Sequence, residues 1–286
     1  MSAPKFQRLV RFENPNGKIY YGELGLEHAA TEQDLIGTSV AIYKGLSPWA
    51  EDFKLTSQKE KIAAVLCPLA NVPLFECIGL NYRKHVEEAG FPKEKYPTVF
   101  TKPPDALAGP YEDIPVHEEC QHMDYEAELC FIIERDCKNI TTDEEALSCV
   151  FGYTAGNDVS SRFWQMPERS GNQHGTGKWY DKFAPIGPTI VNATAVHKSP
   201  NGLSIKTFVN GELRQDARTD DLIFDVPTII RHLTRGKTLR QGTVIMTGTP
   251  GGVAAFMKPP QWLKDNDIVE VEIEKIGRTR NRIVLQ

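Results

Sequence analysis

The chain has 286 residues, of which 40% are hydrophobic and 25% are charged, and its formal net charge is −5. These values are typical of a globular protein with one large domain or two. An acidic chain without a long basic run lacks the charge pattern of a nucleic-acid-binding protein, and no apolar run approaches the roughly 18–20 residues that span a bilayer. We therefore expect no nucleic-acid or membrane partner.

The N-terminal segment MSAPKFQRLVRF is basic and has no early acid, which is a weak mitochondrial signal. It lacks serine enrichment, and it continues directly into FENPNGKIYYGEL, a pattern of two short strands around an Asn-Gly turn. The six cysteines form no Cys-x-x-Cys pair, which indicates reduced thiols. We interpret the segment as a first strand and expect a cytoplasmic protein, with a mitochondrial location as the alternative.

The pattern of the chain changes near residue 72. Residues 1–72 are typical of a small N-terminal domain of short strands with one helix over 56–69, which opens with Thr56 and ends at Pro68. In residues 73–286, apolar runs of strand length recur between clusters of Gly, Pro, Asn and Asp. Few helices are predicted there, at RKHVEEAG (83–90), TDEEALSCV (142–150) and VPTIIRHLTR (226–235). This pattern predicts a β-dominated α+β fold with a curled sheet or barrel.

Two stretches of the chain place acids at every second position. HMDYEAELCFII (122–133) carries Asp124, Glu126 and Glu128 ahead of an apolar run, so the three acids share one face of a strand. DIVEVEIE (267–274) has the same alternation and is typical of a strand with a solvated acidic face. Alternation alone therefore does not predict a site.

The first acidic stretch has a partner about thirty residues later. FGYTAGNDVSSRFWQ (151–165) predicts a strand that ends in a turn and presents a third carboxylate, Asp158. Three clustered carboxylates repel one another, and a divalent cation removes that repulsion. Because the ligands are all oxygens, Mg²⁺, Mn²⁺ or Ca²⁺ fits better than Zn²⁺.

Further polar groups surround this predicted site. His85 and Glu88 lie three residues apart on a predicted helix, a spacing that suits a general base but also an ordinary surface pair. Lys178 lies in a Gly-flanked loop, and Thr249 lies in a Gly/Pro-rich loop after an apolar strand. With Arg162, Gln165 and backbone N–H groups, these are donors that a carboxylate or an enolate requires.

The motifs IGLNYxxHxxE, DYExEL, GYTxxNDVSxR, GKxxDxFxPIGP, VNGELRQ and TGTPxGV occur in this order. Over about residues 75–285 the chain resembles the fumarylacetoacetate hydrolase superfamily. Its tail AFMKPPQWLKDNDIVEVEIEKIG resembles the domain-containing type 2 branch, whose members are associated with oxaloacetate keto–enol tautomerisation. The resemblance implies a β-roll-like catalytic domain over 73–286, a small N-terminal domain over 1–72, and a homodimer.

The resemblance also implies roles for particular residues. The ligands of Mg²⁺ or Mn²⁺, with Ca²⁺ as a further option, would be Glu126, Glu128 and Asp158. Asp124 begins the motif but is not a ligand in the family, so it is expected to lie behind the ligands. The catalytic residues would be His85 and Glu88 on a lid, with Lys178, and the substrate-binding residues would be Arg162, Gln165, Thr249 and Tyr82.

Three features depart from the family pattern and leave the substrate open. Phe163 replaces a frequently polar residue, Ala254 ends a loop that usually reads Gly-Val-Gly, and residues 166–177, with His174, are expected to form a long flexible loop. The implied chemistry is control of a metal-bound enolate of a 2-oxo or 1,3-dicarbonyl acid. We expect C–C bond hydrolysis or decarboxylation of a diketo acid, with an oxaloacetate keto–enol tautomerase as the alternative and an inactive ligand-binding relative as a more distant one.

Overall fold

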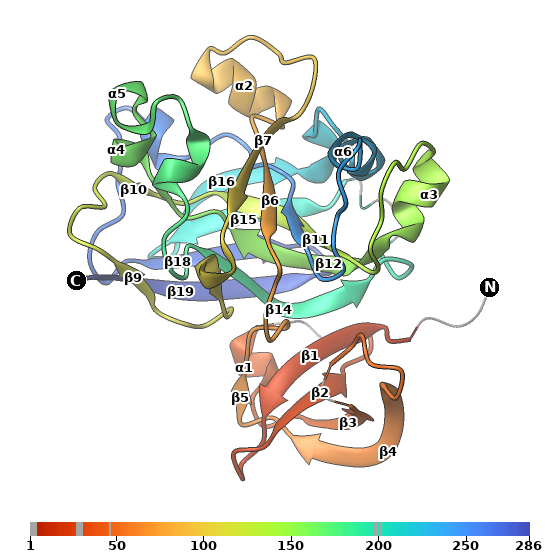
Figure 1. Ribbon diagram of the computed structural model, residues 1–286. Helices are drawn as coiled ribbons and strands as arrows, with labels where there is room; N and C mark the ends of the chain where they lie inside the picture. Colours follow the sequence, from red (N-terminus) through yellow and green to blue (C-terminus); the bar gives the residue numbers. More distant parts are fainter. Residues whose placement is uncertain (1–4, 27–30, 46, 197–199, 201) are drawn as a thin grey trace.

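The computed structural model describes residues 5–26, 31–45, 47–196, 200 and 202–286. Strands dominate, and short helices lie around them (Figure 1). The largest sheet has 12 strands, with the main order β4-β3-β2-β1-β14-β12-β11-β17-β6-β7, and further sheets have five strands (β16-β15-β18-β19-β9) and two strands (β10-β13). The predicted β-dominated fold is confirmed.

The N-terminal strands extend the large sheet. β1 pairs with β14 of the second region, with Leu9 opposite Ile190, so backbone hydrogen bonds connect the two regions (Figure 1). The predicted first strand is confirmed as β1, although residues 1–4 lie outside the described part. The elements are β1 (Arg8–Glu13), β2 (Ile19–Glu23), α1 (Glu32–Leu35), β3 (Ser39–Lys44), β4 (Lys54–Lys61) and β5 (Ala64–Val65).

The helix predicted over 56–69 is wrong. This segment forms most of β4 and then β5, and β4 pairs with β3 with Val40 opposite Glu60. The polar run TSQKEK contains residues that favour a helix, but a short isolated helix is only marginally stable. Pairing with β3 supplies backbone hydrogen bonds that stabilise the strand instead.

In the second region, two buried strands form the centre of the large sheet. Every residue of β11 and β12 is buried, and β11 lies between β12 and β17. The elements up to this point are β6 (Phe75–Gly79), α2 (Arg83–Ala89), β7 (Thr98–Lys102), η1 (Pro104–Ala106), β8 (Leu107–Ala108), β9 (Ile114–Val116), β10 (Met123–Asp124), β11 (Ala127–Ile133), α3 (Asp143–Ser148) and β12 (Val150–Asn157).

The rest of the chain completes the large sheet and adds most of the second sheet. Its elements are β13 (Ser160–Ser161), α4 (Arg162–Gln165), α5 (Pro167–Ser170), η2 (His174–Gly177), β14 (Ala184–Asn192), β15 (Ser204–Val209), β16 (Glu212–Arg218), η3 (Thr219–Asp221), α6 (Val226–Leu233), β17 (Val244–Met246), η4 (Ala254–Phe256), β18 (Ile268–Ile273) and β19 (Gly277–Leu285). A hydrophobic core joins β11 and β12 to β15, β18, α3 and α6.

Local signals explain several of these elements. Thr142 and Glu145 form a capping box that starts α3, and the side chain of Asp225 caps α6. A hairpin turn lies at Asn210-Gly211 between β15 and β16, where both φ angles are positive (51° and 82°), as a type I′ turn requires. The helices predicted at 83–90, 142–150 and 226–235 are confirmed as α2, α3 and α6.

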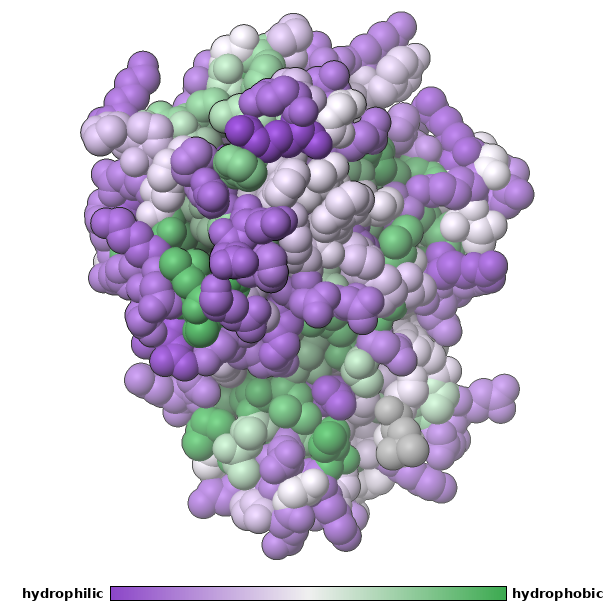
Figure 2. Space-filling model, turned by 60° about the vertical axis from the view of Figure 1, so that its left-hand side comes forward, coloured by the Kyte–Doolittle hydropathy of each residue, from purple (hydrophilic) through white to green (hydrophobic). Residues whose placement is uncertain are grey.

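The second acidic stretch forms the half-exposed strand β18. Its residues alternate between partly exposed and buried, and the acids on the outer face pair with Arg278 of β19, Glu270 at 3.0 Å and Glu272 at 3.6 Å. Hydrophilic residues cover most of the face drawn in Figure 2, with a hydrophobic patch on the lower part, where the N-terminal strands lie. In the described ranges, the helices are all too short or too polar to cross a membrane.

Candidate metal and acid–base site

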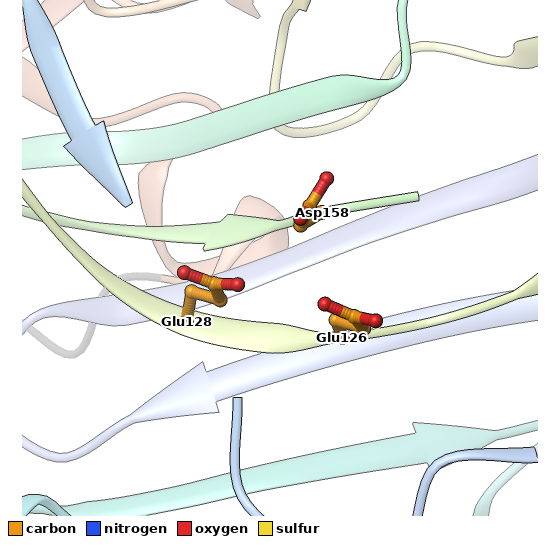
Figure 3. A group of neighbouring side chains, drawn as sticks. All are labelled: Glu126, Glu128 and Asp158. Carbon is orange, nitrogen blue, oxygen red and sulfur yellow. The ribbon is translucent and has the colours of Figure 1, made fainter. Parts of the chain in front are cut away.

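Three carboxylates meet where β11 begins and β12 ends. The antiparallel register places Ala127 opposite Asn157, and the N–H of Asp158 donates to the carbonyl of Glu126 at 2.9 Å. The candidate ligand atoms of Glu126, Glu128 and Asp158 lie within 4.8 Å of one another, and all three residues are buried. Figure 3 shows Glu126 and Glu128 rising from the same side of their strand, with Asp158 on the neighbouring segment.

Two buried lysines neutralise part of this charge. Lys178 Nζ donates to Asp158 Oδ2 at 2.6 Å, to Glu126 Oε2 at 3.0 Å and to Ser160 Oγ at 2.7 Å. Lys102 Nζ donates to Asp158 Oδ1 at 2.5 Å and to two backbone carbonyls. Lys102 could not be predicted as part of the site, because it is the last residue of β7, before Pro103, and belongs to none of the motifs.

The three acids have unequal electrostatic environments. Burial opposes ionisation of Glu126, but the charges of Lys178 and Arg162 hold its pKa at about 2. Burial, together with the charges of Asp158 and Glu126, raises the pKa of Glu128 well above its usual range. The N–H of Gly248 donates to Glu128 Oε2 at 2.5 Å and offsets only part of this effect. In the described part of the chain, Glu128 is therefore the one of the three acids that forms no ion pair with a lysine or an arginine.

This donor set fits a hard divalent cation. All three candidate ligands are carboxylate oxygens. Because the charges of Asp158 and Glu126 oppose ionisation of Glu128, a cation bound between the three would lower the free energy of ionising Glu128. Mg²⁺ and Mn²⁺ favour such oxygen ligands and retain further positions for water or substrate. Ca²⁺ accepts the same donor atoms but usually takes six to eight oxygens, so it would draw on bidentate carboxylates or on more water than Mg²⁺.

We expect Mn²⁺ affinity to fall as the pH is lowered. Because the pKa of Glu128 is raised, this carboxyl holds a proton at pH values where a free glutamate is ionised, and a ligand must lose that proton to bind a cation. Below the pKa, affinity should fall by up to about tenfold per pH unit, with about one proton released on binding. Calorimetry in buffers of different ionisation enthalpy measures that release. An affinity that is constant between about pH 5 and 8 would contradict the prediction.

The predicted acid–base pair, His85 and Glu88, lies on α2. His85 Nδ1 is 3.4 Å from Glu88 Oε2, and the rings of His85 and Phe256 pack edge to face with centroids 5.6 Å apart. Burial opposes ionisation of Glu88, but the hydrogen bonds from His85 and from the N–H of Gly252 lower its pKa overall. His85 is 6% exposed, whereas Glu88 is exposed, so the histidine of this pair is buried and the glutamate lies at the surface.

Several contacts fix α2 near the carboxylates. The N–H of Lys84 donates to Asp221 Oδ2 at 3.1 Å, and the N–H of Gly252 donates to Glu88. Gly252 has a φ of +99°, and a Cβ there would lie 2.3 Å from the carbonyl oxygen of Arg214. Only glycine suits this close approach. The side chain of Asn81 donates to the carbonyl of Thr247 at 2.7 Å and joins the start of α2 to the strand end.

The structure places the remaining predicted donors around the carboxylates. Arg162 Nη2 donates to Glu126 Oε1 at 2.6 Å, and Nη1 donates to Gln165 Oε1 at 2.8 Å. Thr249 Oγ1 accepts from Gln215 Nε2 at 2.8 Å. Gln215 is fully buried and accepts from the N–H of Ala127 at 3.0 Å, so it supports both β11 and the Thr249 loop. The VNGELRQ motif contained Gln215 but indicated no role for it.

Tyr82 takes a different place from the other predicted donors. It is fully buried at the start of α2, and its hydroxyl has no hydrogen-bond partner within the described part of the chain. Burial and the charge of Glu128 raise its pKa, so the hydroxyl keeps its proton. An unpaired buried donor near Glu128 is compatible with a ligand or a water molecule in the site.

The structure shows the conformation and contacts of two segments that depart from the family pattern, Phe163 and residues 166–177. The long flexible loop expected over 166–177 is wrong, because Pro167 starts α5 and His174 starts η2. The ring of Phe163 packs under the guanidinium of Arg169 at 3.8 Å. Burial and the charge of Lys178 lower the pKa of His174, so η2 lies near the site.

Comparison with known proteins identifies the family. The profile described as fumarylacetoacetate (FAA) hydrolase C-terminal matches residues 75–284. The chain belongs to the fumarylacetoacetate hydrolase family. The oxaloacetate tautomerase fahd2, mitochondrial, of Xenopus laevis is 40% identical over 221 residues, which are 77% of this chain and 68% of that protein.

Solved structures in the fumarylacetoacetate hydrolase family share the fold. The 2-hydroxyhepta-2,4-diene-1,7-dioate isomerase of Mycobacterium marinum matches with a TM-score of 0.80 at 29% identity, over 98% of this chain and 99% of that one. The fumarylpyruvate hydrolase of Pseudomonas aeruginosa, in complex with Mn²⁺ and pyruvate, matches with a TM-score of 0.68 at 30% identity, over 81% and 93%. The protein is thus an enzyme of this family, and the expected catalytic fold is confirmed.

Proposed function

We propose that this protein is a divalent-metal-dependent oxaloacetate keto–enol tautomerase. The observation that carries the proposal is the His85–Glu88 pair, whose buried histidine lies close enough to the three carboxylates for its charge to act on Glu126. Relatives such as the Xenopus laevis protein are named oxaloacetate tautomerases, so they favour the tautomerase alternative over hydrolysis or decarboxylation. Every residue of the expected site is retained, which argues against an inactive relative.

Tautomerisation requires one proton to move between a carbon and an oxygen of the substrate. Glu88 lies at Nδ1 of His85 and stabilises the charged imidazole, which leaves Nε2 to take the proton and return it. Lys178 and Arg162 supply positive charge for the substrate carboxylate and the developing oxyanion, and Thr249 and Gln165 supply further hydrogen bonds. The Tyr82 hydroxyl is a further donor beside Glu128.

A bound Mg²⁺ or Mn²⁺ would supply Lewis-acid chemistry that lowers the energy of the enolate. The residues that would hold it are Glu126, Glu128 and Asp158. The depressed pKa of Glu126 and the buried lysines keep part of this site ionised before a cation arrives. His85 then needs to move only a proton, a step that does not consume water.

A second candidate is C–C bond hydrolysis or decarboxylation of a diketo acid. The structure of fumarylpyruvate hydrolase, with Mn²⁺ and pyruvate, supports it, because that enzyme shares the fold. The same pair would then activate a water molecule for hydrolysis, while decarboxylation needs a bound β-carboxylate. The two candidates differ in whether a carbon–carbon bond is broken, which is directly measurable.

The test is a proton-NMR comparison of oxaloacetate, acylpyruvates and fumarylpyruvate with the purified protein and Mg²⁺. The expected result is faster interconversion of the keto and enol forms of oxaloacetate, with little loss of CO₂ and no cleavage, and with the rate enhancement abolished by a chelator. Cleavage of an acylpyruvate at a higher kcat/KM than oxaloacetate tautomerisation would instead support the hydrolase. Enol–keto exchange at the uncatalysed rate would contradict the tautomerase.

The remaining expectations are also proposals. We infer that residues 1–72 and 73–286 are separate domains, although β1 and β14 share a sheet, and that the protein is a homodimer. The word mitochondrial in the names of relatives supports a mitochondrial location over the cytoplasmic one expected from composition. Sedimentation tests the homodimer, and cell fractionation tests the mitochondrial location.

A further inference from the structure

A buried carboxylate that is not a candidate metal ligand contacts two sides of the site. Asp124 lies in β10, is fully buried and accepts four hydrogen bonds. Its Oδ1 accepts from the N–H groups of Tyr125 and Ala254, both at 2.8 Å. Its Oδ2 accepts from Arg162 Nε at 2.8 Å and from the N–H of Ala255 at 3.1 Å. A carboxylate has about four acceptor positions, so Asp124 is saturated.

On one side, Asp124 fixes the guanidinium of Arg162. The other two nitrogens of that group donate to Glu126 and Gln165. Because the donors of a guanidinium lie in one plane, the bond from Nε to Asp124 sets the orientation in which Arg162 meets Glu126.

On the other side, Asp124 fixes the start of η4. The first N–H groups of a helical turn have no partner inside the turn, and Asp124 accepts from two of them. The segment that contains η4 contacts both members of the acid–base pair: the N–H of Gly252 donates to Glu88, and the Phe256 ring packs edge to face with the His85 ring. Asp124 therefore fixes the segment from Gly252 to Phe256, against which His85 and Glu88 pack.

We propose that Asp124 is a positioning residue that fixes the Arg162 side of the site relative to the His85–Glu88 side. Its carboxylate acts through Arg162 and through η4, and it does not touch the acid–base pair in the described contacts. The inference rests on the proposed function, since it takes Arg162 as a substrate-binding group and His85 as the proton carrier.

The test is Asp124→Asn in the full chain. Asparagine keeps the volume but replaces one acceptor oxygen with an NH₂ group, which then faces two N–H donors whichever way the amide is turned. We expect kcat/KM to fall about 10²-fold, as for a displaced catalytic group. We also expect the NMR signals of the His85 ring protons to shift as the Phe256 ring moves. The NMR readout needs no substrate, so it stands even if the proposed reaction is wrong.

The matched control is Glu23→Gln. The Glu23 carboxylate also accepts several hydrogen bonds, from Gln7, Arg8, Gly25 and Tyr43, but it lies in the N-terminal region. The control should leave the His85 signals and kcat/KM unchanged. Unmoved His85 signals in a folded Asp124→Asn variant, or an unchanged kcat/KM, would overturn the proposal.

A double-mutant cycle tests the same connection if Asp124→Asn does not fold. Arg162→Lys changes a residue that donates directly to Asp124, and Phe256→Leu changes a residue of η4, the turn whose first two N–H groups donate to Asp124. If Asp124 couples them, the fold-loss in kcat/KM of the double variant should differ clearly from the product of the two single fold-losses. Independent, multiplicative losses would overturn the proposal.

Discussion

Replacing Glu128 with glutamine should abolish stabilisation by Mn²⁺ without weakening the metal-free protein. Glutamine keeps an oxygen for the N–H of Gly248 but removes the charge that Asp158 and Glu126 repel. Wild-type protein at a Mn²⁺ concentration of about 100 times Kd should gain about 2.7 kcal/mol, whereas the variant should gain almost none. Thermal unfolding with Mn²⁺ and with a chelator measures both quantities.

The sign of the metal-free effect follows from proton linkage. In the unfolded chain Glu128 ionises near the ordinary glutamate pKa of 4.5, whereas the folded carboxyl holds its proton to higher pH. As the pH rises above about 4.5, the unfolded state therefore loses a proton first, and wild-type stability declines. The glutamine side chain does not titrate, so near about pH 7 the metal-free variant should be at least as stable as wild type.

Glu270→Gln is the matched control for this experiment. Glu270 lies on β18 in the same alternating pattern, but its carboxylate pairs with Arg278 on the half-exposed face of that strand. This variant should keep the full stabilisation by Mn²⁺. A Glu128→Gln protein that Mn²⁺ stabilises as strongly as wild type would show that Glu128 is not a ligand.

The carboxylate cluster could be predicted from the sequence because short-range rules position it. Strand alternation puts Glu126 and Glu128 on one face, and a single antiparallel register brings Asp158 beside them. The His85–Glu88 pair follows from helical spacing in the same way. Alternation was not sufficient by itself, since β18 shows the same pattern with its acids paired on its half-exposed face.

The residues that the sequence did not reveal depend on contacts between distant segments. Lys102 reaches Asp158 only because the folded sheet brings their strands together, and 56 positions separate them in the chain. Gln215 and Ala127 are 88 positions apart. The helix predicted over 56–69 is wrong for the same reason, because hydrogen bonding to β3 outweighs the local helix propensity of this segment. Likewise, Asp124 was expected to lie behind the ligands, but its bonds to Ala254 and Ala255 could not be foreseen.

Replacing His85 with alanine should lower kcat for oxaloacetate tautomerisation by about 10²–10⁴-fold, the usual contribution of a positioned general acid or base. The change removes the ring nitrogen that exchanges the proton but leaves the three carboxylates and Lys178 in place. Mn²⁺ affinity should therefore stay within about threefold of wild type. Stopped-flow absorbance of the enol gives kcat, and calorimetry gives the affinity.

Two further variants decide how a loss in His85→Ala should be interpreted. Glu88→Gln removes the charge that stabilises the imidazolium, so it should also lower kcat, by less than the loss of the ring itself, and should leave Mn²⁺ binding intact. His117→Ala removes an exposed histidine that follows β9 and should change neither quantity. If His85→Ala retains wild-type kcat while Mn²⁺ remains essential, the proton carrier is another group, and the His85–Glu88 pair serves only to hold the segment that contains Gly252 and Phe256.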